Sequence, residues 1–201
     1  MAGLDEAGRG CLFGPVFAAA VILPDPCPVR GLRDSKQLPP DRREVLAESI
    51  RRHATAWAVG RAEAEEIDHI NILQASRLAM KRAVEQIDPP PDFLLVDAIT
   101  VDVPILQRGL IHGDARCRSI AAASILAKVH RDACLREFDT IYPHYGLARN
   151  KGYGAPEHFR GLEQFGASGQ HRFTFAPLKG FASPRESSQL ALFAAGGARE
   201  R

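Results

Sequence analysis

Short apolar runs without helical spacing recur in the first half of the chain and predict the strands of a sheet. The runs Ala2–Asp5 and Gly14–Leu23 flank a glycine-rich turn at Ala7–Gly10, and glycines placed in this way are typical of a turn between strands. Ala54–Ala62 alternates between two faces, whereas Phe93–Val96 is a continuous apolar run. A continuous run of this length is typical of a buried strand. These four apolar segments therefore predict strands.

Apolar residues at helical spacing predict the helices. Asp41–His53 follows a Pro-Pro pair, which suits a helix start, and Glu63–Ile87 is closed by three prolines. In Glu63–Ile87 the residues expected to face inward are Ile67, Ile70, Leu73, Leu78 and Val84. Arg116–Phe138 is the longest helical segment, and its small residues permit close packing against a sheet. Pro156–Phe165 predicts a further short helix.

The order of these elements predicts an α/β fold in a single domain. Strands lie in the first and middle parts of the chain, and helices follow them to cover the sheet. The length of 201 residues is that of one typical domain. Residues 24–40 and 142–155 predict loops, and the chain from Lys179 onward is rich in Ser, Gly and Ala, which is typical of disorder. We expect one domain over residues 1–178 and a flexible tail over residues 179–201.

Composition and charge narrow the class of protein. Hydrophobic residues make up 45% and charged residues 25% of the chain, as in ordinary soluble proteins. The longest apolar run, Val16–Leu23, is far shorter than the roughly 20 residues that span a bilayer. The four cysteines form no C-x-x-C pair, and acidic residues stand where a signal peptide would be basic. We therefore expect a reduced, cytoplasmic protein with no membrane partner, and a monomer.

The charge is unevenly distributed along the chain. Residues 1–100 hold 12 basic and 15 acidic residues, a net charge of −3, whereas residues 101–201 hold 14 and 9, a net charge of +5. Five of the seven histidines also lie in the second half. This asymmetry favours a polyanionic partner held by the second half, although charged, solvated faces alone would produce the same pattern.

Four acidic residues lie where apolar runs end, and they are the candidate catalytic or metal-binding residues of the chain. Asp5, Glu6 and Asp97 follow the first and fourth predicted strands, and Asp114 closes a further strand candidate at Leu110–Asp114. A desolvated carboxylate is costly unless it is paired or bound to a metal, and oxygen ligands select Mg²⁺ or Mn²⁺. Each Asp alone could instead cap a turn or helix. A glycosidase pair is the other alternative, but the chain has few aromatic residues for a sugar platform.

Beyond single residues, a series of motifs resembles ribonuclease HII in order along the chain. The motifs span residues 2 to about 178 and are DEAGRG (Asp5–Gly10), GP (Gly14–Pro15), DSK (Asp34–Lys36), IDHINILQAS (Ile67–Ser76), LLVD (ending at Asp97), GDARCRSIAAASILAKVHRD (Gly113–Asp132), YPHYG (Tyr142–Gly146), NKGYG (Asn150–Gly154) and HRFTFAP (His171–Pro177).

The resemblance implies a fold and an activity. The fold is RNase H-like, a mixed five-stranded sheet flanked by helices with a C-terminal helical extension. The activity is endonucleolytic cleavage 5′ to ribonucleotides in RNA:DNA hybrids and at single ribonucleotides in duplex DNA, leaving 3′-hydroxyl and 5′-phosphate ends. Two divalent ions, Mg²⁺ or Mn²⁺, are expected at Asp5, Glu6, Asp97 and Asp114, which match the metal-binding carboxylates of the family.

The resemblance also implies which residues recognise the substrate. Gly8, Arg9 and Gly10 match the segment that senses the ribose 2′-hydroxyl, and Tyr153 matches the tyrosine that packs on the sugar. Glycines let the backbone approach the ribose closely, and the 2′-hydroxyl separates RNA from DNA. Contacts to the nucleic-acid backbone are expected from Ser35, Lys36, Arg116, Ser119, Ser124, Lys128 and Lys151.

Some positions depart from the family pattern. Cys11-Leu12-Phe13 replaces Pro-Leu-Ala, and Ala98 stands where glycine commonly follows the third acid. Neither change removes a carboxylate. The related ribonuclease HIII is the nearest competitor and typically carries threonine where Arg9 stands, so Arg9 favours recognition of the junction between ribonucleotide and DNA. A non-catalytic hybrid-binding or clamp-tethered adaptor with the same fold is the alternative function, and the presence of all four carboxylates argues against it.

Two expectations concern the ends of the chain. The first strand starts only four residues before Asp5, so we expect it to be short and frayed. In the tail, the QLALF motif resembles the peptide by which bacterial repair proteins bind the sliding clamp. Its anchors are Gln189, Leu190, Leu192 and Phe193, and apolar anchors on a tether suit binding in a groove.

Overall fold

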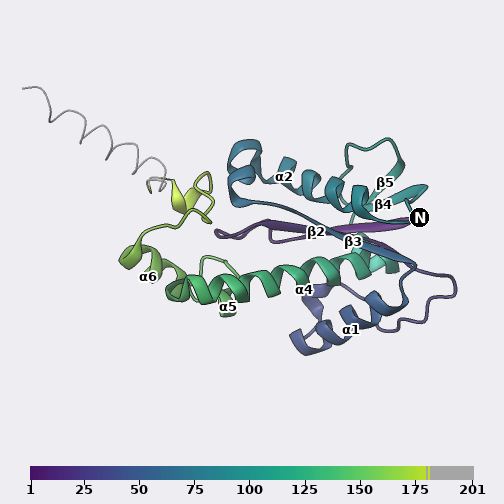
Figure 1. The fold of residues 1–201 in the computed structure, drawn as a ribbon, viewed down its shortest axis with the longest axis horizontal. Coiled ribbons are helices and arrows are strands. Elements are labelled where there is room, and N and C mark those ends of the chain that lie inside the picture. The colour runs from purple at the N-terminus through teal and green to yellow at the C-terminus, as the bar shows by residue number, and fades with distance from the viewer. Residues whose placement is uncertain (180, 182–201) are drawn as a thin grey trace, which may run out of the picture.

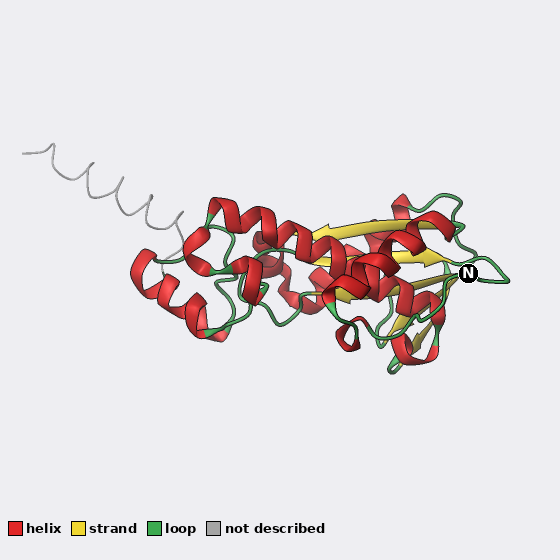
Figure 2. Ribbon diagram, turned by 90° about the horizontal axis from the view of Figure 1, so that it is seen from below, coloured by secondary structure: helices red, strands yellow, loops and turns green. Residues whose placement is uncertain are grey.

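The computed structural model describes residues 1–179 and 181, which form a five-stranded sheet with helices on both faces (Figures 1 and 2). The strand order is β3-β2-β1-β4-β5. The strands are β1 (Ala2–Ala7), β2 (Val16–Ile22), β3 (Ala56–Ala62), β4 (Phe93–Asp97) and β5 (Leu106–Leu110). The first three strands are antiparallel neighbours, whereas β4 runs parallel to both β1 and β5. The mixed α/β architecture expected from the sequence is confirmed.

The two faces of the sheet are covered by different helices, as Figure 1 shows. Helix α2 (Ala64–Gln86) lies on one face, and α4 (Arg118–Ile141) lies on the other, with α1 (Pro40–His53) packed outside α4. Small residues allow α4 to lie very close to β1. A Cβ atom on Gly3 would stand 2.2 Å from the Ser119 carbonyl carbon, so only glycine fits there.

β1 occupies the centre of the sheet and is not frayed. It pairs with β2 from Gly3 to Ala7 and with β4 from Ala2 to Leu4. Leu4 is fully buried. The expectation of a frayed first strand is wrong because hydrogen bonds to neighbours on both sides hold this short segment.

Helix α2 is two helical segments joined at a kink. Asn71 has a φ of 67°, and its Oδ1 accepts the N–H groups of Leu73 at 3.0 Å and Gln74 at 3.2 Å, so that it caps the second segment. The kink changes the rotational phase of the helix. Ile70 and Leu73 are therefore 37% and 36% exposed, and the prediction that both face inward is wrong.

The chain around Asp114 also differs from the expectation. β5 ends at Leu110, His112 takes a left-handed conformation with φ 54°, and Gly113–Arg116 form the short helix α3. Asp114 therefore lies on α3 and does not close a strand. Cys117 is extended and separates α3 from α4, so the long helix begins at Arg118 and not at Arg116.

The C-terminal part of the described chain forms a helical extension at one end of the sheet (Figure 1). Its elements are η2 (Pro143–Tyr145), α5 (Leu147–Asn150), α6 (Pro156–Phe165) and η3 (Ala176–Leu178). The region expected to be a loop at residues 142–155 thus contains two short helical turns. A 3-10 turn, η1 (Ser35–Gln37), precedes α1. The extension is held to the sheet by a core in which the fully buried Phe13 contacts Tyr145 and His171.

Candidate active site

A cavity of about 250 Å³ opens where β1 ends, and it gathers most of the predicted site residues. Its lining comes from β1 and the turn after it, from η1, from α4 and from the loop before α6. The residues that line it are Asp5, Glu6, Ala7, Gly8, Arg9, Gly10, Ser35, Lys36, Ser124, Lys128, Arg131 and Tyr153. Segments distant in sequence therefore meet at one site.

Asp5 is a buried carboxylate facing α4. Its side chain is close to Ser124 of α4, and its Oδ1 accepts the N–H of Glu6 at 2.7 Å. Burial raises the pKa of Asp5 well above its ordinary value, and repulsion from Glu6 and Asp97 adds to this shift, whereas the bonds from Ser124 and the Glu6 N–H oppose it. The carboxylate is therefore held where a negative charge is disfavoured.

Glu6 has one oxygen with a partner and one without. Its Oε1 accepts a bond from Arg9 Nη1 at 3.2 Å, whereas Oε2 is buried and has no hydrogen-bond partner. Burial raises the pKa of Glu6; Arg9 lowers it, and repulsion from Asp97 adds to the upward shift. An unpartnered buried carboxylate oxygen is costly, so this atom marks a place for a positive ligand.

Asp97 lies at the end of β4 and Asp114 lies on α3. Together with Asp5 and Glu6 they form what we call the acidic edge. Leu4 pairs with Val96 in the parallel ladder, which places Asp97 beside Asp5. Asp97 Oδ1 accepts the Gly113 N–H at 2.7 Å, which links β4 to the residue before Asp114. Burial, followed by repulsion from Asp34 and Asp97, raises the pKa of Asp114. The four predicted acids thus influence one another through Asp97.

The side chains of the acidic edge are not arranged to hold a metal ion in this structure. Within residues 1–179 and 181, no three acidic, histidine or cysteine side chains stand where they could together hold a metal ion without moving. Oxygens of Glu6 and Asp97 are directed at Arg9 and Gly113 instead. Ala98, which replaces the usual glycine, has a φ of 58°, a conformation that glycine adopts more easily.

Gly8–Gly10 and Lys151–Tyr153 form two loops that face each other across the cavity; we call them the first glycine loop and the Tyr153 loop. The Leu12 N–H donates to the Gly152 carbonyl at 2.8 Å and joins the two loops. A Cβ on Gly10 would lie 3.8 Å from the Tyr153 ring. Tyr153 is 50% exposed, and the Cys11 thiol, then burial, raise the pKa of its hydroxyl. A half-exposed ring beside an open backbone can contact a ligand.

The residues predicted to contact a nucleic-acid backbone fall into two groups. Ser35, Lys36, Ser124 and Lys128 line the cavity. Ser124 donates to Ser35 Oγ at 2.9 Å, and both hydroxyls are buried. Lys128 Nζ pairs with Asp132 at 2.5 Å, and burial lowers the pKa of this lysine.

The second group does not line the cavity. Arg116 is exposed, and Ser119 is buried in the first turn of α4. Lys151 Nζ donates to the Ala148 carbonyl at 2.5 Å. The four residues of the tail motif, Gln189, Leu190, Leu192 and Phe193, lie outside the described residues.

Arg131 lines the cavity but sequence reasoning missed it. It follows Lys128 on α4 and is 1% exposed. In the sequence it reads as one basic residue among many, because nothing local marks it as buried. The signal that could have found it is indirect: the glycines at 8 and 152 both contact it in the fold.

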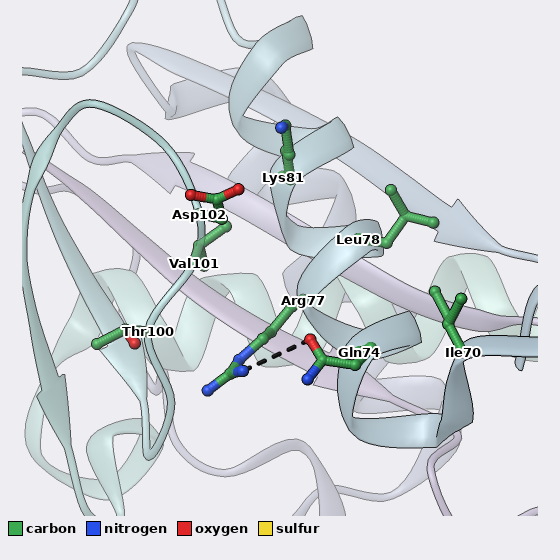
Figure 3. A pocket seen from close by; sticks show the side chains of 8 residues that line it. All are labelled: Ile70, Gln74, Arg77, Leu78, Lys81, Thr100, Val101 and Asp102. Atoms are coloured by element: carbon green, nitrogen blue, oxygen red, sulfur yellow. Dashed lines mark hydrogen bonds between the residues drawn. The ribbon is translucent and has the colours of Figure 1, made fainter.

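A second cavity of about 590 Å³ lies between α2 and the loop after β4 (Figure 3). Figure 3 shows Arg77 directed toward Gln74, with its Nη1 3.5 Å from Oε1. Of the described residues that line this second cavity, none is a predicted site residue. Among residues 1–179 and 181, no helix has the length and apolar character needed to cross a membrane.

Comparisons with known proteins agree with this architecture. The family model described as Ribonuclease HII matches residues 2–177. Ribonuclease HII of Solibacter usitatus (strain Ellin6076) is 58% identical over 179 residues, which is 89% of this chain and 78% of that protein. Ribonuclease HII of Koribacter versatilis (strain Ellin345) is 52% identical over 192 residues, 96% of this chain and 76% of that protein.

Solved structures share the fold. The ribonuclease H2 from Pyrococcus horikoshii OT3 has a TM-score of 0.75 and 26% identity, covering 89% of this chain and 94% of that chain. The RNase HII in the PCNA:RNase HII complex from Archaeoglobus fulgidus has a TM-score of 0.70 and 25% identity, covering 90% and 97%. Bst-RNase HIII in complex with Mn²⁺ has a TM-score of 0.66 and 20% identity, covering 94% and 69%, and shares the fold alone.

Proposed function

Because the chain belongs to the ribonuclease HII family and is a ribonuclease H hydrolase, we propose that it cleaves 5′ to ribonucleotides. The substrates are RNA:DNA hybrids and duplex DNA with single embedded ribonucleotides, and the products carry 3′-hydroxyl and 5′-phosphate ends. Residues 1–178 form the catalytic domain. The observation that supports this proposal most directly is the acidic edge, where Glu6 keeps a buried oxygen without a partner and where burial and mutual repulsion raise the pKa values of Asp5 and Glu6 in a cavity open to a ligand.

The donor set fits divalent metal ions. Glu6 Oε2 is buried without a partner, and burial and repulsion raise the pKa values of Asp5 and Asp114. A hard dication relieves this repulsion and takes oxygen ligands. Asp5, Glu6, Asp97 and Asp114 would hold two Mg²⁺ or Mn²⁺ ions after the Glu6 and Asp97 side chains turn from their present partners. The Mn²⁺ complex of Bst-RNase HIII is consistent with this choice of ion.

When bound, two such ions supply an activated water molecule and stabilise the charge that develops on the leaving oxygen. The protein's own residues do the remaining work. Asp5 and Asp97 set the position of the acidic edge through the β1–β4 ladder. Arg9 is released when Glu6 turns, and its guanidinium becomes available to the substrate. Lys36 and Lys128 offer positive charge to the phosphates on either side.

Recognition of the ribose is assigned to the first glycine loop and to Tyr153. Gly8 has a φ of 98°, so the backbone there has a conformation that other residues rarely adopt. The half-exposed Tyr153 ring stands opposite Gly10 and packs on the sugar. The 2′-hydroxyl is the group by which a protein distinguishes RNA from DNA.

The test uses a labelled duplex DNA that contains one ribonucleotide, an all-DNA duplex of the same sequence, and the full-length protein. With Mg²⁺ or Mn²⁺ we expect a single cut 5′ to the ribonucleotide and a product that a DNA polymerase can extend, which reports a 3′-hydroxyl. Chelator should stop cleavage, and the all-DNA duplex should stay intact. An uncut ribonucleotide duplex with either ion would reject the enzyme and favour a binding function.

The sliding clamp is the proposed protein partner of the tail. The PCNA:RNase HII complex shows that a member of this group of enzymes assembles with such a clamp, and the QLALF motif supplies apolar anchors. Replacing Leu192 and Phe193 by alanine should abolish capture of the full chain by a bacterial clamp, while cleavage of a short duplex is unchanged. Replacing Arg199 and Glu200 by alanine is the matched control. Unchanged capture by the Leu192/Phe193 variant would rule out the motif.

A further inference from the structure

Two fully buried arginines, Arg131 and Arg172, hold the turn that follows β1. They are 1% and 0% exposed. A buried guanidinium is costly unless its N–H groups find partners. Here the partners are main-chain carbonyls of the turn and of the Tyr153 loop, and Arg172 Nη2 is the one nitrogen of the two guanidinium groups that is buried without a partner. The guanidinium groups of these two arginines therefore fix the backbone of the turn and of the Tyr153 loop through hydrogen bonds.

Arg131 bonds the Tyr153 loop to Phe13 and Pro15, in the segment that follows the first glycine loop, and it packs against Gly8 of that loop. Its Nη1 donates to the Lys151 carbonyl at 2.9 Å, and its Nη2 donates to the Phe13 carbonyl at 3.2 Å. Its Nε donates to the Pro15 carbonyl at 3.3 Å. The planar guanidinium fixes the directions of its hydrogen bonds. This one side chain therefore sets the distance between the Phe13–Pro15 segment and the start of the Tyr153 loop.

The glycines of both loops lie directly on Arg131. A Cβ on Gly8 would stand 2.0 Å from Arg131 Nε, and one on Gly152 would stand 2.9 Å from the Phe13 carbonyl oxygen and 3.5 Å from Arg131 Nη2. Both glycines have positive φ, 98° and 78°. Lys151 is also left-handed, with a φ of 54°, and its carbonyl is held by Arg131. The guanidinium therefore supports the strained backbone on each side.

Arg172 holds the first glycine loop from the other direction. Its Nη1 donates to the Arg9 carbonyl at 2.9 Å, and its Nε donates to the Gly14 carbonyl at 3.0 Å. Asp68 accepts the N–H groups of the next two residues at 2.8 and 2.9 Å, so the segment that carries Arg172 is fixed to α2. The Arg9 carbonyl is consequently anchored to the body of the protein.

We propose that Arg131 and Arg172 are positioning residues that fix the first glycine loop relative to Tyr153 and thereby set the preference for an isolated ribonucleotide. This inference rests on the proposed function. An isolated ribonucleotide offers one 2′-hydroxyl to the loop, so a displaced loop loses its only contact. A continuous hybrid offers a 2′-hydroxyl at every RNA position, and its shape is recognised over many nucleotides. Loop displacement therefore weakens cleavage of the isolated ribonucleotide more.

The discriminating variant is Arg131→Lys. Lysine keeps the charge but has one nitrogen, which cannot reach the three carbonyls that Arg131 joins. We expect kcat/KM on the single-ribonucleotide duplex to fall about tenfold more than kcat/KM on an equally long RNA:DNA hybrid. Arg136→Lys is the matched control, because Arg136 is exposed on the same helix and bonds Glu44. The control should leave the ratio of the two substrates unchanged.

Binding measurements separate this inference from the proposed activity. Without divalent ions, fluorescence anisotropy should show that the wild type prefers the single-ribonucleotide duplex over the all-DNA duplex and that Arg131→Lys has lost part of this preference. If the wild type cuts neither substrate, the proposed activity fails, and the binding preference still decides the positioning role. Equal losses on both substrates in Arg131→Lys, at unchanged melting temperature, would overturn the positioning role.

Further measurements test the proposal if Arg131→Lys does not fold. Arg172→Lys should produce the same selective loss. Combining Arg131→Lys or Arg172→Lys with Arg9→Ala should add little to the loss of preference, because all three substitutions act through the first glycine loop. In the wild type, the Leu12 amide that joins the loops should exchange hydrogen as slowly as the β1 amides. Fast exchange of this amide would show that the loops are not held together and would contradict the proposal.

Discussion

Asp5 and Glu6 of the acidic edge line the same cavity as the first glycine loop and the Tyr153 loop, but the two regions differ in how their polar groups are satisfied. At the acidic edge, burial and repulsion raise the pKa of Asp5, and Glu6 Oε2 has no partner. In the loops, the carbonyls of residues 9, 13–15 and 151 all accept bonds from buried arginines. Although Arg9 pairs with Glu6 Oε1, the acidic edge still holds a buried carboxylate oxygen without a partner, whereas these backbone carbonyls are already bonded to guanidinium groups.

This difference indicates separate roles in the unbound protein. The loops are held in place before a ligand arrives, which lowers the cost of recognising it. Under the proposed function, the acidic edge is destabilised until cations bind, which is common where charge is used in catalysis. Substitutions at the acidic edge should therefore change activity greatly and stability little or favourably. Substitutions that disturb the support of the loops should lower stability.

The largest expected effect comes from Asp97→Asn. The amide oxygen of asparagine can still accept the Gly113 N–H, which Asp97 accepts at 2.7 Å, so the fold is retained while the charge is lost. Single-turnover cleavage should fall by about a thousandfold or more, and duplex affinity should change less than about twofold, because phosphate contacts are elsewhere. Asp102→Asn, in the loop after β4, is the control. Cleavage retained by Asp97→Asn would remove Asp97 from the ion site.

Sequence pattern predicted the parts of this site that depend on local periodicity. Phe93–Val96 forms a strand with Asp97 at its end, and Asp5 lies in a strand, as expected. That these two strands are neighbours was not predicted, because pattern alone gives no strand order. Asp114 was misplaced because the chain turns through a left-handed His112 into a short helix, and an apolar run does not reveal such a turn. The kink at Asn71 was missed for the same reason, since spacing alone does not show a change of helical phase.

The support of the glycine loops could not be predicted locally. Arg131 and Arg172 contact residues that lie more than a hundred positions away in the chain. Their burial depends on how α4 and the C-terminal segment pack, and arginines in general are exposed. Arg131 and Arg172 both lie within motifs that resemble the family, but the resemblance assigned a role in recognition only to Gly8–Gly10 and Tyr153 and did not show that these arginines hold them.

The next largest effect concerns two histidines that support the Tyr153 loop. The Ser168 N–H donates to His171 Nδ1 at 3.0 Å, the two Nε2 atoms of His171 and His158 are 3.0 Å apart, and His158 Nδ1 is 2.9 Å from the Tyr153 carbonyl. The Tyr153 carbonyl can only accept, so His158 Nδ1 donates to it, and His171 Nε2 donates to His158 Nε2. All three bonds require both rings to be neutral.

Acid should therefore lower the stability of the fold, because protonation breaks the hydrogen bonds that join His171, His158 and the Tyr153 loop. Burial lowers the pKa of His171 to about 3 and lowers the pKa of His158. Between pH 6.5 and 3 the unfolded chain binds a proton at His171 that the folded chain does not, so stability falls as pH falls. From pH 6.5 to 5 the free energy of unfolding should fall by about 2 kcal/mol on account of His171. Urea unfolding at several pH values measures this free energy.

Matched variants identify the source of this acid sensitivity. His171→Gln should show a shallower dependence of the unfolding free energy on pH between 6.5 and 5. His53→Gln, at the exposed end of α1, should keep the wild-type dependence. Equal pH dependence in the wild type and in His171→Gln would show that another group causes the acid sensitivity.

The smallest expected effect is a gain of stability in Asp5→Asn. The folded pKa of Asp5 is raised above the unfolded value of 3.8, so the stability contributed by the protonated form is lost as pH rises above 3.8. Asparagine cannot ionise, so it avoids the cost of burying a charge at this position, and its side-chain oxygen can still accept the Glu6 N–H. In chelator the free energy of unfolding should therefore rise by about 1 kcal/mol.

The response to metal ions distinguishes this charge effect from better packing. Mg²⁺ or Mn²⁺ at ten times its dissociation constant should stabilise the wild type by about 1.4 kcal/mol, and Asp5→Asn should gain little of this increment. Glu163→Gln on α6, distant in sequence from all four acids, should respond to the ions as the wild type does. If the ions stabilise Asp5→Asn as much as the wild type, Asp5 does not bind them, and the raised pKa reflects burial alone.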